Sequence, residues 1–135
     1  DVDGDGADEI VTAPGPGGGP HVRVFRPNGQ EVVGFMAYAP SFTGGVYLGS
    51  TEQGANRGDF VITGAGEGGG PHVRVWNPNG TERVGFIAGF PNNGVRVAGG
   101  RFRGSTPGDL ALVGGPGSLS IVKLTRIDGS LLLLN

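Results

Sequence analysis

The segment Gly17-Gly18-Gly19-Pro20-His21-Val22-Arg23-Val24-Phe25 returns almost letter for letter as Gly68-Gly69-Gly70-Pro71-His72-Val73-Arg74-Val75-Trp76. In both copies, valines alternate with charged or aromatic residues, which is the two-residue period of a β-strand with one buried face. Glycines and a proline stand before each strand, and these residues mark turns. The chain is therefore built from repeated β units.

The match continues on the C-terminal side of these segments. Pro27-Asn28-Gly29 matches Pro78-Asn79-Gly80, and Val33-Gly34-Phe35 matches Val84-Gly85-Phe86. A weaker third copy comprises Asp109–Gly115, Leu119–Leu124 and Asp128-Gly129. No segment shows the helical period. Within the second unit, we predict four strands, over residues 46–50, 59–65, 72–77 and 82–88.

A repeated four-stranded unit of about 50 residues is typical of β-propeller blades. The sequence predicts an all-β fold, a partial β-propeller of about three four-stranded antiparallel blades in a single repeat domain. The blades would be residues 1–41, which lack the first strand, 42–89 and 90–135. An open β-solenoid is the main alternative, but its coils are shorter.

Three blades are too few for a ring, since propellers have about 4 to 8. We therefore expect the chain to be a fragment of a longer protein. The alternative is self-association through the open blade edges, because unpaired strands attract partners.

Composition excludes several classes of function. The 135 residues carry a net charge of only −2, so nucleic acid is not an expected partner. Cysteine is absent, and no apolar run approaches the roughly 20 residues of a membrane span. We find no nucleophile with a positioned base and no zinc-binding spacing, so we predict no catalytic residues and no enzyme activity.

Five of the 12 acidic residues lie in the first nine positions, in the sequence DVDGDGADE. Carboxylates at alternate positions around a glycine turn suit Ca²⁺, which takes about 6 to 8 oxygen ligands. The alternative is a plain Asp-Gly turn exposed to water. The predicted ligands are the side chains of Asp1, Asp3, Asp5 and Glu9 and the carbonyl of Ala7, with Asp8 as the alternative to Glu9.

This loop, with the Asp8–Gly15 segment that follows it, resembles the calcium hairpin of the FG-GAP repeat family, the blades of integrin α-subunit propellers. The letters GPGGGPHVRVF and FTGGV are closer to a bacterial secreted subtype, and the resemblance covers almost the whole chain. It implies a calcium-binding propeller module of a secreted or cell-surface protein. Such a module would mediate adhesion or recognition of a protein or glycan ligand. The alternatives are an accessory, non-catalytic blade set of a secreted hydrolase and a self-assembling structural repeat.

In that family the calcium loop commonly recurs from blade to blade, but here it decays. We match it to Glu52–Asp59 in the second unit and to Phe102–Asp109 in the third, which retain few acidic residues. The sequence thus predicts one calcium site, and a metal at 52–59 stays open. Arg57-Gly58-Asp59 spells a tripeptide that integrins bind, but the third unit has Pro107-Gly108-Asp109 in the matched place. The start of a strand therefore explains the tripeptide without an adhesion role. The repeated His21 and His72 are expected to pack between blades.

Overall fold

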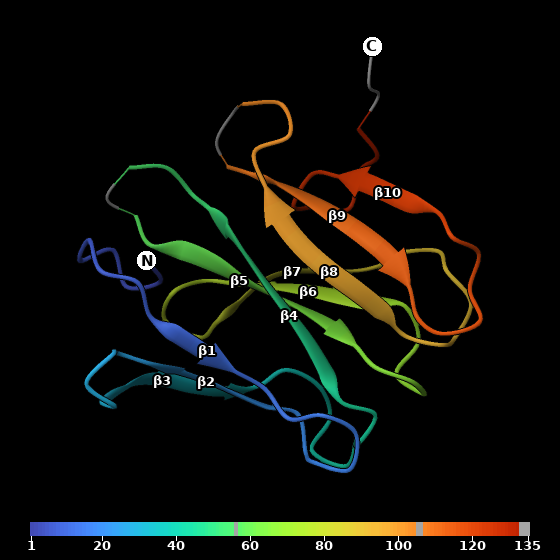
Figure 1. Ribbon diagram of the computed structural model, residues 1–135, viewed down its shortest axis with the longest axis horizontal. Coiled ribbons are helices and arrows are strands. Elements are labelled where there is room, and N and C mark those ends of the chain that lie inside the picture. Colours follow the sequence, from blue (N-terminus) through green and yellow to red (C-terminus); the bar gives the residue numbers. More distant parts are fainter. Residues whose placement is uncertain (56, 105–106, 133–135) are drawn as a thin grey trace.

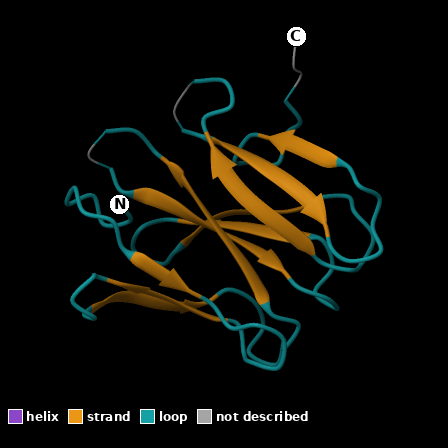
Figure 2. Ribbon diagram, viewed as in Figure 1, coloured by secondary structure: helices purple, strands orange, loops and turns teal. Residues whose placement is uncertain are grey.

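The computed structural model describes residues 1–55, 57–104 and 107–132, which form ten β-strands and no helix (Figure 2). None of these residues therefore belongs to a helix that could cross a membrane. The strands are β1 Ile10–Thr12, β2 His21–Phe25, β3 Glu31–Met36, β4 Val46–Glu52, β5 Asp59–Ala65, β6 His72–Trp76, β7 Glu82–Ile87, β8 Val95–Gly100, β9 Asp109–Gly114 and β10 Val122–Thr125.

The strands form three antiparallel sheets, one in each predicted unit (Figure 1). Their orders are β1-β2-β3, β4-β5-β6-β7 and β10-β9-β8. The all-β prediction is confirmed, and the four strands of the second unit have nearly the predicted ends. The three sheets do not close into a ring, so the propeller arrangement stays a prediction.

Asn-Gly or Asp-Gly turns close the equivalent hairpins of the three units. Gly29, Gly80 and Gly129 have φ values of 86°, 79° and 84°, a left-handed conformation that glycine adopts without a steric penalty. The Gly29 N–H donates to the Arg26 carbonyl at 2.9 Å, and the Gly80 N–H donates to the Asn77 carbonyl at the same distance. The turn chemistry read from the sequence thus sets these hairpins.

Two apolar cores lie between neighbouring sheets. Val61 and Ile62 are adjacent on β5 and point to opposite faces of the middle sheet. Val61 packs with Val24 of the first sheet, whereas Ile62 packs with Leu112 of the third, and all four side chains are almost fully buried. The middle sheet is therefore covered on both faces.

A buried polar cluster joins the first two sheets. The Thr63 hydroxyl is fully buried and accepts hydrogen bonds from the Trp76 indole at 3.0 Å and the Tyr38 hydroxyl at 3.3 Å. Tyr38 also lies 2.9 Å from the His72 carbonyl oxygen, and its ring centroid is 5.6 Å from the His72 ring. His72 thus packs between sheets as expected. His21 is exposed.

The first and second sheets are joined by contacts equivalent to those that join the second and third sheets. The Arg74 guanidinium donates to the Ala37 carbonyl of the first unit at 3.2 Å. At the equivalent place in the third unit, the Lys123 ammonium donates to the Ala88 carbonyl of the second at 2.8 Å. The same packing geometry is therefore used twice.

A second repeated contact corrects one match made from the sequence. The Asp59 N–H donates to the Asp1 carbonyl at 2.8 Å, and the Gly108 N–H donates to the Glu52 carbonyl at 2.9 Å. The strand registers agree, because they align Asp59 with Gly108 and Phe60 with Asp109. The match of Asp59 with Asp109 is wrong by one residue, since the shared Gly-Asp letters do not occupy the same place in the ladder.

The third sheet is less regular than the other two. Strand β10 begins at Val122, so Leu119 and Ile121 lie outside it and are 73% and 48% exposed. The expected fourth strand is represented by one bridge between Thr125 and Leu131, and residues 133–135 lie outside the described part of the chain. Four strands are thus found in the second unit only among the described residues.

Replacing Thr63 with valine should destabilise the protein by about 1–3 kcal/mol, because the buried Trp76 N–H loses its acceptor. Denaturant unfolding measures this loss. Thr12→Val is the matched control, since Thr12 holds the equivalent position on β1 and is exposed. Equal losses for the two variants would contradict the role assigned to the Thr63 hydroxyl.

Candidate metal centre

The loop before β1 brings four of the predicted ligands together. One carboxylate oxygen from each of Asp1, Asp3, Asp5 and Glu9 lies within 4.8 Å of the others. In Figure 1, this loop and those after β4 and β8 lie at corresponding ends of their sheets. The described residues contain no other cluster of this kind.

Hydrogen bonds within the loop hold its carboxylates in place. Asp1 accepts from the Gly4 and Gly6 N–H groups at 2.7 and 2.9 Å. Asp3 accepts from the Asp5 N–H at 3.1 Å, two residues ahead, as in an Asx turn. Gly4 and Gly6 have φ values of 79° and 93°, so the loop requires glycine there. The Ala7 N–H donates to Asp5 at 2.9 Å. This contact does not involve the Ala7 carbonyl, whose role as a metal ligand stays a prediction.

Glu9 has one carboxylate oxygen without a partner. Its Oε2 accepts from the Val2 N–H and, at 3.3 Å, from the Asp3 N–H. Its Oε1 is buried and has no hydrogen-bond partner among the described residues. An unpaired buried polar atom costs free energy, more so when it is charged. A cation inside the loop would remove this cost.

Asp8, the alternative ligand, lies outside the cluster. Its side chain is exposed and is 3.1 Å from the α-amino group of Asp1. The same amino group lies 3.1 Å from Asp59 of the second unit. Glu9 rather than Asp8 therefore completes the group of converging carboxylates.

Arg26, which the sequence interpretation missed, supplies a positive charge to this loop. It follows β2, and its Nη2 donates to Asp3 Oδ2 at 2.6 Å, with Asp5 Oδ2 3.8 Å from Nε. The hydrogen bond from Arg26 lowers the pKa of Asp3, and the reciprocal bond raises the pKa of Arg26. A cluster of acidic residues favours a nearby positive charge, but no local pattern in the sequence identifies Arg26 as the residue that supplies it.

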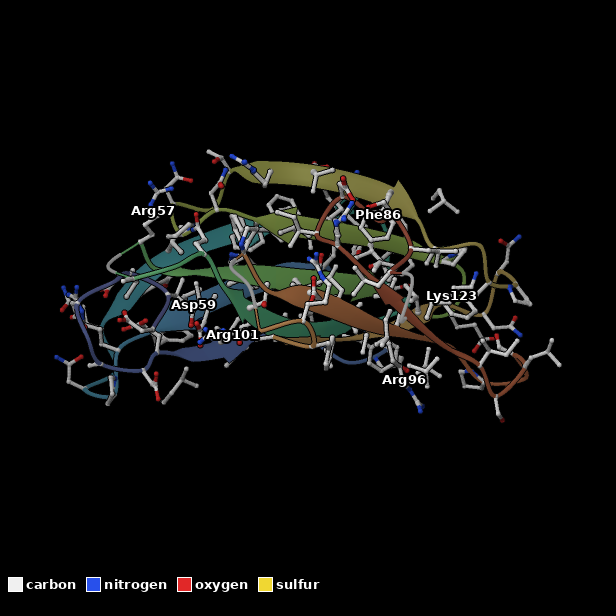
Figure 3. All side chains as sticks on the ribbon, turned by 90° about the horizontal axis from the view of Figure 1, so that it is seen from above. Arg57, Asp59, Phe86, Arg96, Arg101 and Lys123 are labelled. Atoms are coloured by element: carbon white, nitrogen blue, oxygen red, sulfur yellow. The ribbon has the colours of Figure 1, made fainter. Side chains whose placement is uncertain are left out.

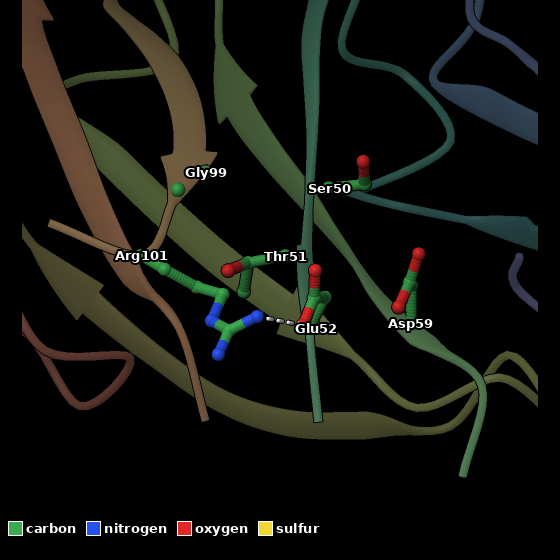
Figure 4. Close-up of a pocket in the computed structure, with 7 residues that line it drawn as sticks. Ser50, Thr51, Glu52, Asp59, Gly99 and Arg101 are labelled. Atoms are coloured by element: carbon green, nitrogen blue, oxygen red, sulfur yellow. Dashed lines mark hydrogen bonds and ion pairs between the residues drawn. The ribbon is translucent and has the colours of Figure 1, made fainter. Parts of the chain in front are cut away.

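The second loop has a different arrangement. Glu52 at the end of β4 is paired with Arg101 of the third unit at 3.2 Å (Figure 4). Both line a small cavity of about 260 Å³ that also contacts Thr51 and Asp59. Figure 3 likewise shows Asp59 close to Arg101. Residue 56 lies outside the described residues, so a metal at 52–59 stays open.

Packing explains the Gly58-Asp59 part of the Arg57-Gly58-Asp59 tripeptide. Gly58 has a φ of 68°, and a Cβ there would stand 2.2 Å from the Val2 carbonyl oxygen. Asp59 begins β5 and donates its N–H to Asp1. The glycine is thus required where the first two units touch, in agreement with strand entry.

Comparison with protein-family models, with curated proteins and with solved structures finds no match to this chain. Membership of the FG-GAP family therefore stays a prediction based on the residues quoted above.

The Asp3 carboxyl should titrate below its ordinary pKa of 3.8 in calcium-free protein, because Arg26 stabilises its charged form. Since the folded pKa is lowered, the stability gained from this pair is present above 3.8 and is lost as the pH falls through the folded value. A carbon-detected NMR titration measures the midpoint.

Arg26→Met should move that midpoint upward. Arg23→Met is the control, because Arg23 pairs with Glu31 instead. An unchanged midpoint in Arg26→Met would contradict the assigned contact.

Proposed function

We propose that this chain is a calcium-stabilised repeat module, part of the β-propeller of a secreted or cell-surface protein. The observation that carries the proposal is the convergence of one carboxylate oxygen from each of Asp1, Asp3, Asp5 and Glu9 within 4.8 Å of one another. Oε1 of Glu9 is also buried and has no hydrogen-bond partner among the described residues. Hard oxygen ligands of this kind and number suit Ca²⁺. Asp1, Asp3, Asp5 and Glu9 would hold the ion, with the Ala7 carbonyl and water completing its coordination.

The role of the ion would be structural. Calcium would bind the folded loop and not the unfolded chain, and would therefore stabilise the fold by linkage. Extracellular modules use calcium sites of modest affinity, because calcium is abundant outside cells. This reasoning supports the proposed location.

The propeller arrangement is supported by the repeated step between sheets. Arg74 and Lys123 make equivalent contacts to the preceding unit, and the N–H groups of Asp59 and Gly108 do the same. Units that pack on one another with the same geometry form a closed ring when the rotation between successive units adds up to a full circle. Further units of the same kind would then continue the series.

Recognition of a protein or glycan is the activity we propose for such a module. The loops at the ends of the sheets are free to vary while the strands keep the fold, as in other scaffolds that bind through loops. Self-assembly is a second candidate, favoured by exposed apolar side chains on the third unit. These side chains are Leu119, Ile121, Val122 and Leu131.

Calcium titrated calorimetrically into metal-stripped protein should bind at one site and raise the melting temperature. Glu9→Gln should weaken binding by about tenfold or more, because a charged ligand is lost while an acceptor for the Val2 N–H is kept.

The neighbouring Asp8→Asn is the matched control and should bind nearly as the unmodified protein does. Absence of binding would reject the calcium site. A loss confined to Asp8→Asn would move the last ligand from Glu9 to Asp8.

A further inference from the structure

The loop of the third unit contains a buried ion pair. Asp109 begins β9 and its side chain is fully buried. The Arg103 guanidinium donates hydrogen bonds to this carboxylate. Its Nη2 lies 2.6 Å from Oδ1, and its Nε lies 3.1 and 3.2 Å from Oδ1 and Oδ2. This fork geometry gives both strength and a fixed orientation.

Asp109 occupies the position that Glu9 holds in the first unit. The strand registers align Glu9 with Phe60 and Phe60 with Asp109. Independently, the Asp3 N–H donates to Glu9 Oε2 at 3.3 Å, and the Arg103 N–H donates to Asp109 Oδ2 at 3.2 Å. Each donor lies six residues before its acceptor.

Arg103 therefore stands where the first loop has Asp3. In the first loop, Asp3 adds a negative charge, and one oxygen of Glu9 stays buried without a partner among the described residues. In the third loop, the same position carries a positive charge that pairs with both oxygens of the buried carboxylate. The second unit has Gly54 and the buried Phe60 at these two positions.

We infer that the Arg103 guanidinium is the built-in cation of the third loop and takes the place that a metal ion would occupy. A buried carboxylate needs a positive partner, whether a metal or a side chain. Arginine keeps its positive charge at any pH that a protein tolerates, so the Asp109 carboxylate always has a cationic partner. The third loop then folds without calcium.

The inference uses the proposed calcium site of the first loop for comparison, but the contacts of Arg103 stand without it. The two are separable because the loops lie in different peptides. Failure of the calcium proposal would appear at residues 1–9, and failure of the present one at residues 101–109.

Hydrogen exchange followed by mass spectrometry on the full chain tests the inference, with calcium and with a chelator. Peptides covering 101–109 should gain no more protection from calcium than peptides covering 110–125 of the same unit do, since calcium at the first loop can act on both only through the stability of the whole fold. In Arg103→Met, the 101–109 peptides should exchange about tenfold faster or more, because Asp109 is left buried without its partner. Arg101→Met is the matched control, since it removes a guanidinium of the same loop that pairs with Glu52 instead.

Arg103→Asp replaces the positive partner of Asp109 with a second carboxylate. Its 101–109 peptides should exchange at least as fast as those of Arg103→Met, both in calcium and in the chelator, because two carboxylates fall far short of the about 6 to 8 oxygen ligands that Ca²⁺ takes.

Three results would overturn the inference. The first is a gain in protection of 101–109 on adding calcium to the unmodified chain that exceeds the gain of peptides covering 110–125. The second is unchanged exchange in Arg103→Met, and the third is an Arg103→Asp loop that exchanges as slowly as the unmodified one.

Discussion

The rest of the structure depends on the covering of both faces of the middle sheet. Six of the seven residues of β5 are buried, with no alternation of exposed and buried positions. A strand covered on one side would alternate, whereas a strand between two layers reads as a continuous apolar run. Phe60, Val61 and Ile62 form such a run. In β2 of the first sheet, by contrast, His21 and Arg23 are exposed while Val22 and Val24 are buried.

The strands and hairpins could be predicted because their signals are local and repeated. Alternating valines with an Asn-Gly turn specify a hairpin from a few adjacent residues. The contacts that could not be predicted are those that depend on the register of the β-strands or on residues far apart in the sequence. The shared Gly-Asp pair predicts that Asp109 matches Asp59, but the register of β8 with β9 aligns Asp109 with Phe60 instead. Ile121 fits an alternating pattern, yet the third sheet leaves it exposed before β10 begins.

The candidate site was predictable in part for the same reason. The spacing of Asp1, Asp3 and Asp5 is local, and the structure brings these side chains together with Glu9. Arg26 comes from another turn, and its contact with Asp3 depends on how the first sheet folds back over the loop. Asp8 and Glu9 could not be separated by spacing, because neighbouring residues differ only in the direction their side chains take.

The three loops use one backbone position in different ways. It holds a carboxylate in the first unit, the buried Phe60 in the second and the Asp109 carboxylate paired with Arg103 in the third. An apolar side chain needs no partner, whereas a buried charge needs one. A repeat can therefore lose its acidic residues without losing its fold, provided that this position is either apolar or neutralised.

The loops also contribute to the contacts between sheets. Val2 is 3% exposed in the first core, and its N–H donates to Glu9. The adjacent Asp1 carbonyl accepts the Asp59 N–H that begins β5. The backbone that holds the acidic cluster is thus the same backbone that closes the first core and docks the second sheet. A cation bound there would act on the contact between units as well as on the loop, because the loop cannot open without exposing Val2 and releasing Asp59.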